Sequence, residues 1–418
     1  MLYRDRAIVY DAARFLADTA MTMNPVAMCV PTNLSFIDKD WKTCAKAGHF
    51  SNPKFQYDKD ELRRIALLGI KISGYWTQVR LNCKAQNDID DAILKILEGR
   101  VCDALLTAEI AASILDEDDA RTQEAIIGLY GNPTGSLIAN AYDSIAHPTV
   151  RREGRRSRFS DAKLAELEAM KFNAADIRKQ FISVFNYYGF RSAWECIIDE
   201  RISNAIDARD KTATGKSQLV IPSKKTVDGR ALASLIGHEI ESHIRGSENS
   251  RALFRQLLGE NSPLLSTVPL LAKSDDERFY EGVAKMSDVA TNGDKSLPHP
   301  YYTIAIHRAE SGESFGDIAQ VIYMLKHDGS TSEDDAANFA WNVTRRVFRG
   351  CTDTSIGFAN TKDYGYFAGY EIAKRVPASY RDYSSMTISD LQLLEEAGVN
   401  LESPRYPYKD AVEFIFGE

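Results

Sequence analysis

Apolar residues recur along most of this chain at the spacing of helices. From Asp58 onward they return every three or four residues, and the segments 89–97 and 104–115 repeat the pattern. Two further helices are expected over 161–170 and 174–187. This periodicity predicts a mostly helical protein.

Turns and short strands interrupt the helices. The first 60 residues are rich in turn-forming steps such as Asn-Pro and are expected to wrap around short helices. Strands are predicted over 194–199 and 216–222, and helices dominate again over 274–328 and 332–349. The order of elements favours an α+β fold.

Composition indicates an ordinary globular protein. Hydrophobic residues make up 44% of the 418 residues and charged residues 26%, close to the globular average. No apolar run approaches the roughly 20 residues of a membrane helix, and charged residues interrupt the N-terminal stretch, so neither a membrane span nor a signal peptide is predicted. Six scattered cysteines without a Cys-x-x-Cys pair favour reduced thiols and a cytoplasmic location.

The charge balance argues against nucleic acid as a general partner. The formal net charge is −8, whereas nucleic-acid binding needs an excess of Lys and Arg to neutralise phosphates. One stretch departs from this balance, with five arginines between Arg151 and Arg158. It is either an exposed linker or a docking patch for an acidic partner.

One predicted helix carries the residues that suggest chemistry. It begins at Asp228, a good N-cap residue, and is expected to end near Gly246, a common helix stop. Within it, His238 and Glu239 are followed by His243. Metalloproteases of the His-Glu-x-x-His type space their histidines four residues apart, but here the spacing is five.

The five-residue spacing has a geometric consequence. At about 100° per residue, an α-helix would leave His238 about 140° around from His243, too far for both rings to bind one ion at about 2.0–2.1 Å. A π-bulge inserts a residue into the helical hydrogen-bond ladder and would turn the rings toward each other. We therefore predict an irregular turn here. The alternative is one core histidine and one solvated histidine, without a metal.

The sequence around the motif of His238, Glu239 and His243 favours the metal site over the alternative. The motif follows the predicted strand 216–222, and in many zinc peptidases an edge strand precedes the metal-binding helix and pairs with an extended substrate. Glu239 stands beside the first histidine, where a general base would be needed.

Several stretches resemble the tyrosine carboxypeptidase family, which includes the microtubule-associated tyrosine carboxypeptidase. The stretch 235–245, with Asn249, is similar to the family signature and shares its five-residue histidine spacing. Further strings match in the same order between residues 50 and 375: Leu129–Pro133, the strand at Trp194, Tyr280–Ala284, Arg346–Gly350, and Lys362-Asp363 with Tyr366 and Gly369. Their joint order carries the resemblance.

Pattern and resemblance together predict the architecture. We expect a mostly helical α+β protein, with an N-terminal helical region over 1–160 packed on a zincin-like catalytic domain over 161–418.

The resemblance also implies a set of site residues. His238, His243 and Glu281 would hold zinc, and Glu239 would be the catalytic base. Two imidazoles and one carboxylate leave a fourth position for water, as in catalytic zinc sites, and Glu239 would pass a proton from that water to the leaving amine. From the pattern of its own helix, Glu281 would instead be a solvated surface carboxylate. Glu241 replaces the usual family Gly and is expected to be exposed.

A carboxypeptidase must also recognise the terminal carboxylate of its substrate, which calls for a cation. Arg349 and Lys362 are the first choices because they fall in family-like strings, and Arg345, Arg346 and Arg308 could serve equally well.

Tyr366 and His307 are candidate donors to the oxyanion formed during attack. The predicted function is zinc-dependent removal of a C-terminal residue, which is the tyrosine of α-tubulin in the family's characterised relatives. Two alternatives stay open. One is another zinc hydrolase, such as an endopeptidase or an amidase of cell-wall peptides, and the other is a non-enzymatic interaction module on the same fold.

Overall fold

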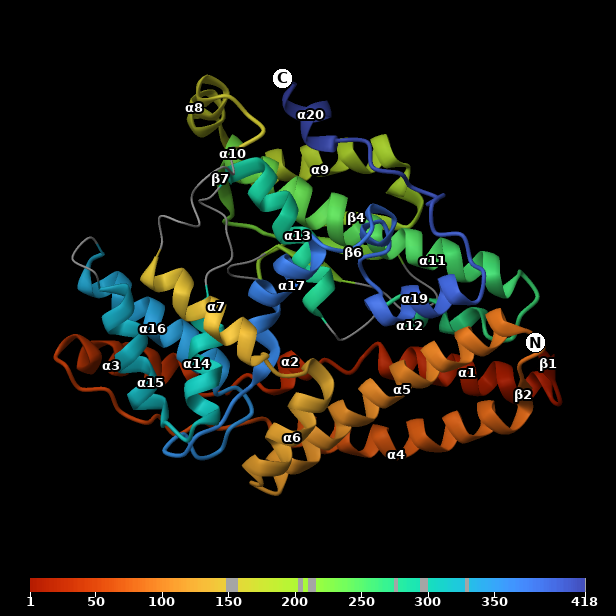
Figure 1. Ribbon diagram of the computed structural model, residues 1–418, viewed down its shortest axis with the longest axis horizontal. Helices are drawn as coiled ribbons and strands as arrows, with labels where there is room; N and C mark the ends of the chain where they lie inside the picture. The colour runs from red at the N-terminus through yellow and green to blue at the C-terminus, as the bar shows by residue number, and fades with distance from the viewer. Residues whose placement is uncertain are drawn as a thin grey trace.

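The computed structural model describes residues 1–147, 157–201, 206–209, 216–273, 277–293, 300–327 and 331–417. Helices account for most of these residues and the strands are short, which confirms the predicted mostly helical α+β class (Figure 1). None of the described helices is long and apolar enough to cross a membrane.

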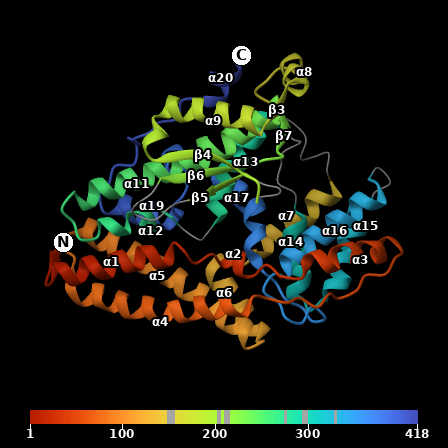
Figure 2. The same cartoon turned by 180° about the vertical axis from the view of Figure 1, so that it is seen from behind.

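The N-terminal part is built from helices, of which α1, α4, α5 and α6 lie side by side (Figures 1 and 2). The helices are α1 (Arg6–Ala20), α2 (Pro25–Met28), α3 (Leu34–Lys46), α4 (Lys59–Asn82), α5 (Asp88–Leu115), α6 (Asp119–Tyr130) and α7 (Gly135–Ala146). At the closest approach of α4 and α5, a Cβ on Gly69 would lie 2.4 Å from the Cβ of Ala108. β1 (Leu2–Tyr3) and β2 (Cys83–Lys84) pair and tie the N-terminus to the end of α4.

A small sheet lies in the upper half of the molecule (Figure 1). Its strands are β4 (Trp194–Asp199), β5 (Asp207–Arg209) and β6 (Ser217–Pro222), in the order β4-β6-β5. β4 runs parallel to β6 and β5 antiparallel to it. Both predicted strands are confirmed, but the expectation that β6 is an edge strand was wrong. The short polar segment β5, which no apolar pattern marks in the sequence, pairs with its second side.

A helix–strand–helix segment precedes β4 in the chain. α8 (Asp161–Ala169) leads through β3 (Lys171–Asn173) into α9 (Ala174–Tyr188), which packs on β4 and β6. β3 pairs with β7 (Thr226–Asp228), the strand that enters the candidate helix. The helices predicted over 161–170 and 174–187 are thus confirmed.

The helix with the histidines is longer than predicted. α10 (Gly229–Leu235), a π-helix over Ile236–Ile244 and α11 (Arg245–Leu258) follow one another without a break. Asp228 caps the start as predicted, since its carboxylate accepts the N–H of Ala231 at 2.8 Å. The predicted end near Gly246 was wrong. Gly246 instead allows the turn that contains Ser384 to approach the helix closely, because a Cβ on Gly246 would lie 2.3 Å from Ser384 Oγ.

Most of the rest of the described chain is helical, and the described residues confirm the helices expected over 274–328 and 332–349. These helices are α12 (Val268–Leu271), α13 (Glu277–Asn292), α14 (Tyr301–Glu310), α15 (Phe315–Lys326), α16 (Glu333–Val347), α17 (Gly365–Ala373), α18 (Ala378–Arg381), α19 (Ile388–Glu396) and α20 (Ala411–Phe416).

Two large buried clusters form most of the core, beside a third that consists of Ala141, Ile304 and Phe367. The larger joins the N-terminal helices to α14–α19, and so draws on both sides of residue 160. The smaller lies among the sheet, α9, α10 and the π-helix, and its buried residues run from Ala174 to Val412. A domain boundary at residue 160 stays a prediction. The π-helix belongs to the smaller cluster and α13 contributes to the larger, so the candidate site forms where the two clusters meet.

Candidate metal centre

The π-helix brings the two histidines together. Its i→i+5 hydrogen bonds place residues five apart on the same face, and the rings of His238 and His243 lie with centroids 4.8 Å apart and planes at 88°. Ile236, Ile240 and Ile244 are fully buried in the smaller core on the other side. The predicted irregular turn is confirmed.

Side chains hold the carbonyl groups of this irregular turn. Ser242 Oγ donates to the carbonyl of Gly237 at 2.8 Å, and Arg245 Nε donates to the carbonyl of Glu241 at 2.8 Å. The carbonyl of Ser242 accepts from Ser384 Oγ at 3.1 Å. Because buried carbonyls need partners, these polar groups stabilise a backbone form that is rare in helices.

Glu281 of α13 completes a group of three potential ligands. Its Oε2 lies 3.7 Å from Nε2 of His238 and 3.9 Å from Nε2 of His243. One ligand atom from each residue lies within 4.8 Å of the other two. Ligand atoms of a tetrahedral zinc site with bonds of about 2.0–2.1 Å are about 3.3–3.4 Å apart, so small side-chain shifts would fit an ion. The chemistry and spacing of these donors therefore suit a metal.

The position of Glu281 depends on a crossing of two helices. α13 and α17 pack backbone to backbone, because a Cβ on Gly282 would lie 2.1 Å from the carbonyl oxygen of Gly369. A Cβ on Gly369 would lie 1.8 Å from the carbonyl oxygen of Arg278. The helix pattern of the sequence predicted a solvated Glu281, whereas in the fold its side chain is only 14% exposed.

Negative charge gathers around His238. Burial would lower its pKa, but Asp288, Glu239 and Glu281 raise the pKa of His238 to about 9. The environment thus favours a cation at this ring. His243 differs, because burial and the neighbouring His238 lower the pKa of His243 well below its ordinary value. Its imidazole is therefore neutral, the form that binds metals.

His243 is positioned mainly by an aromatic neighbour. Its ring stacks on Tyr280, the residue before Glu281, with centroids 3.7 Å apart and an interplanar angle of 22°. Its Nδ1 is buried and has no hydrogen-bond partner among the described residues. Glu239 is half-buried beside His238 and outside the three-residue group.

Three of the four predicted substrate residues gather around one buried carboxylate. Arg349 Nη2 donates to Asp363 at 2.6 Å, and Arg346 donates to both oxygens of the same carboxylate at 2.9 and 2.5 Å. Lys362 is the residue before Asp363, and its positive charge helps to lower the pKa of the Asp363 carboxyl. Tyr366 joins through Arg346, whose guanidinium carbon lies 5.9 Å from the tyrosine ring centroid.

The other candidates have partners other than Asp363. His307 of α14 faces Tyr142 of α7 edge to face, with ring centroids 6.2 Å apart. Arg308 pairs with Glu313 at 2.8 Å, and Arg345 donates to Asn342 at 3.0 Å. The catalytic, metal and substrate roles of all predicted site residues stay predictions.

Glu241 corrects one expectation of the sequence analysis. Its residue is 3% exposed rather than solvated. The carboxylate accepts hydrogen bonds from Tyr188 Oη at 3.1 Å and from the backbone N–H of Ala411, and burial raises the pKa of Glu241. The expectation failed because the C-terminal residues cover this side of the helix, and a helical wheel does not contain them.

One other prediction falls partly outside the described residues. Residues 151–156 of the arginine run are not among them, and Arg158 forms an ion pair with Asp410.

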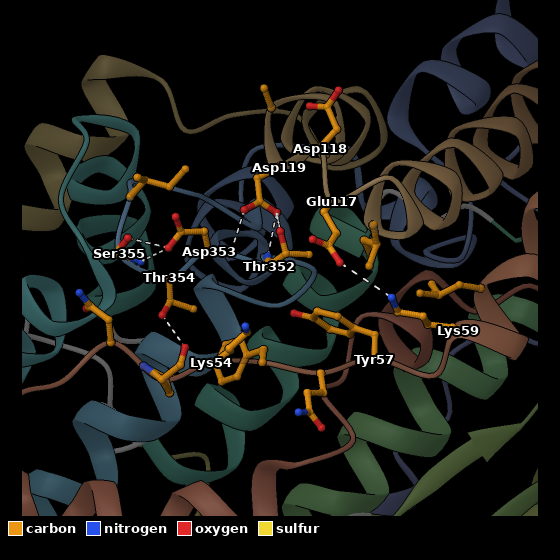
Figure 3. A pocket seen from close by; sticks show the side chains of 18 residues that line it. Lys54, Tyr57, Lys59, Glu117, Asp118, Asp119, Thr352, Asp353, Thr354 and Ser355 are labelled. Atoms are coloured by element: carbon orange, nitrogen blue, oxygen red, sulfur yellow. Dashed lines mark hydrogen bonds and ion pairs between the residues drawn. The ribbon is translucent and has the colours of Figure 1, made fainter.

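A large cavity of about 1070 Å³ lies apart from the metal group. Residues 52–59, 114–120 and 352–356 supply most of its lining (Figure 3). Asp119 links two parts of the lining, because its carboxylate accepts hydrogen bonds from the N–H groups of Thr352 at 2.7 Å and Asp353 at 2.9 Å. None of its lining residues belongs to the metal group or to the predicted substrate residues.

The fold and the site define a class of protein. A His-Glu-x-x-x-His helix facing a glutamate from a second helix, on a mostly helical α+β fold, is the arrangement of zincin-like metallopeptidases. The family described as microtubule-associated tyrosine carboxypeptidase matches residues 45–394, and the chain belongs to this family. It is therefore an enzyme of the metallocarboxypeptidase class. A search of curated proteins finds no match.

Proposed function

We propose that this protein is a zinc-dependent carboxypeptidase that removes a C-terminal tyrosine from a peptide or protein. The observation that carries the proposal is the group His238, His243 and Glu281, in which both imidazole Nε2 atoms face one carboxylate oxygen at 3.7 and 3.9 Å. The family description supplies the type of reaction and the residue removed.

Zinc is the metal that best suits this ligand set. Two histidines and one glutamate are typical of catalytic zinc sites, which keep one position open. When bound, zinc would lower the pKa of water toward about 7 and polarise the scissile carbonyl. His238 and His243 would bind through their Nε2 atoms, and Glu281 through its carboxylate.

Glu239 is the proposed general base. It neighbours His238 in the sequence and is half-buried at the border of the metal group. Its carboxylate accepts a proton from the attacking water and delivers it to the leaving amine of the substrate. A glutamine at this position keeps the shape of the side chain but cannot take up the proton.

The cations around Asp363 are the proposed receptor for the substrate carboxylate. Arg346, Arg349 and Lys362 all lower the pKa of this single buried carboxyl. Three positive side chains therefore surround one negative carboxylate, and positive charge is in excess. Arg349 is buried and already bonded to Asp363, whereas Lys362 is half-buried and better placed to reach a ligand. Tyr366 and His307 remain the proposed donors to the oxyanion.

The proposed partner is the C-terminal tail of a protein in the cytoplasm, in keeping with the microtubule association in the family description. The arginine run between Arg151 and Arg158 is the candidate contact for an acidic tail.

Metal analysis and peptide cleavage test the proposal together. We expect about one zinc per chain in the wild type, by analogy with single catalytic zinc sites, and loss of zinc in His243→Ala. Glu239→Gln should keep zinc and lose about 10²–10⁴-fold in rate. Glu166→Gln on α8 is the matched control, because that carboxylate is 54% exposed, and its rate should equal the wild type.

The substrates should be paired peptides that end in Tyr with a free or an amidated C-terminus. Mass spectrometry should show loss of tyrosine from the free acid only. Internal cleavage, or equal hydrolysis of the amide, would favour an endopeptidase. A wild-type protein without zinc would favour the non-enzymatic interaction module.

A further inference from the structure

One helix supplies carboxylates to both nitrogens of the same imidazole. Glu281 and Asp288 are seven residues apart on α13, about two helical turns, and so lie on one face. Glu281 Oε2 faces Nε2 of His238 at 3.7 Å. Asp288 Oδ2 lies 3.1 Å from Nδ1 on the other side of the ring. His238 is therefore held between two points of α13.

The carboxylate of Asp288 is itself fixed by several groups. Its residue is 7% exposed. Oδ1 accepts from Ser234 Oγ at 2.6 Å, and Oδ2 accepts from Lys285 Nζ at 2.7 Å. Asn292 donates to Ser234 Oγ at 3.1 Å and extends the network. Asp288 thus cannot turn away from His238 without breaking bonds to both α10 and α13.

This contact determines which nitrogen of His238 can bind a metal. An ionised carboxylate only accepts hydrogen bonds, so Nδ1 of His238 carries the proton that it shares with Asp288. Nε2, which faces Glu281, is then the nitrogen that would give up its proton to bind a metal. Partners of this kind fix the tautomer and orientation of metal-binding histidines and raise their basicity.

The two histidines are held in different ways. His243 Nδ1 has no hydrogen-bond partner among the described residues, and the ring is held by stacking on Tyr280. Asp288 therefore forms a hydrogen bond with only one of the two histidines. Removing it should change His238 and leave the surroundings of His243 intact.

We propose that Asp288 is the positioning residue of the metal site, which holds His238 with Nε2 directed at the ion. The inference rests on the proposed function, because it assumes that His238 is a ligand. Loss of such a partner typically lowers metal affinity about 10–100-fold. A purely structural role, as the ion-pair partner of Lys285, is the competing explanation.

The test compares Asp288→Asn with Lys285→Met in the full chain. Zinc affinity is measured by competition with a chromophoric chelator, and stability by thermal unfolding in EDTA. We expect Asp288→Asn to bind zinc about 10–100-fold more weakly. Lys285→Met removes one hydrogen bond to the carboxylate but leaves it facing His238, so it should lose much less. The visible spectrum of the cobalt-substituted protein should change in Asp288→Asn alone, because His238 is a direct ligand.

Ser234→Ala gives a milder second variant in case Asp288→Asn does not fold. It removes one hydrogen bond to the same carboxylate without touching His238, and zinc affinity should fall in the same direction by a smaller factor. Wild-type affinity in Asp288→Asn, or an equal loss in Lys285→Met, would overturn the positioning role. Absence of zinc from the wild type would instead refute the proposed function, so the two failures are distinguishable.

Discussion

The π-helix and α13 both supply potential ligands to the metal group, but they position them by different means. The π-helix brings His238 and His243 together through a local change of its own backbone, which Ser242 helps to hold. α13 is a regular helix, and it places Glu281 because it crosses α17 at Gly282. Two ligands on one helix depend on local hydrogen bonding, whereas a ligand from a second helix depends on how the helices cross.

This comparison leads to predictions in which effects on stability and effects on metal affinity can be measured separately. Changes at the α13–α17 crossing should lower the stability of the whole fold and displace Glu281 with it. Loss of the Ser242 support within the π-helix should affect metal affinity more than global stability, because the apolar core beneath it stays intact.

The largest effect is expected at Asp363, which lies just before α17. Asp363→Asn would leave the buried Arg349 and the half-buried Arg346 without their carboxylate, and removing one partner of a buried ion pair costs about 3–5 kcal/mol. Urea unfolding should show this loss. Asp60→Asn is the matched control, because its side chain is 93% exposed and its loss should be small. Equal losses in the two variants would show that Asp363 does not anchor α17.

The same carboxylate predicts how stability depends on pH. Burial opposes ionisation of Asp363, but Arg349 and Arg346 outweigh it and lower the pKa of Asp363. The unfolded state then binds the proton more readily, so the contribution is complete above the ordinary pKa of 3.8 and is lost as the pH falls through the folded value. Unfolding curves of the wild type and Asp363→Asn should converge in acid. A constant difference between them would contradict the prediction.

Gly282→Ala tests the crossing directly. Its Cβ would meet the backbone oxygen of Gly369 at 2.1 Å, and a backbone atom cannot move aside by a side-chain rotation. We expect a loss of about 3 kcal/mol, together with weaker zinc binding as Glu281 shifts. Gly74→Ala on α4 is the control, because nothing lies within 4 Å of its Cβ position. It should stabilise the protein by about 0.5–1 kcal/mol, and similar effects in both variants would mean that the crossing tolerates a side chain.

Glu241→Ala tests the outer side of the π-helix. It would leave the buried Tyr188 hydroxyl and the N–H of Ala411 without their acceptor, at a cost of about 2 kcal/mol. Glu241→Gln keeps an acceptor oxygen and should lose less. Glu98→Ala provides an exposed control, since its side chain is 45% exposed. Thermal unfolding would disprove the role of Glu241 if all three variants matched the wild type.

The smallest expected effect on stability is that of Ser242→Ala. Loss of its hydrogen bond to the carbonyl of Gly237 should cost about 1 kcal/mol, but zinc affinity should fall because the π-helix is less firmly held. Ser183→Ala removes a similar bond to the carbonyl of Lys179 on α9 and should leave zinc affinity unchanged. Unaltered zinc binding in Ser242→Ala would show that the π-helix does not need this support.

Much of the fold could be predicted from the sequence where the signal is local. The helices, the strands β4 and β6 and the Asp228 cap follow from periodicity and capping preferences. The π-helix was predictable as well, because histidines five residues apart cannot meet on a regular α-helix. The errors at Gly246, at Glu241 and at the edge of the sheet share one cause. In each case another segment, at Ser384, Ala411 or β5, contacts the position.

The sequence by itself therefore determined the helical class, the family and the irregular turn that brings His238 and His243 together. Only the tertiary structure decided that Glu281 faces these histidines, that Asp288 bonds His238 from the same helix, and that Glu241 is buried. The physical reason is that a helical pattern records which side of a helix is apolar. It does not record which neighbour covers each side, and that depends on backbone contacts such as the one between Gly282 and Gly369.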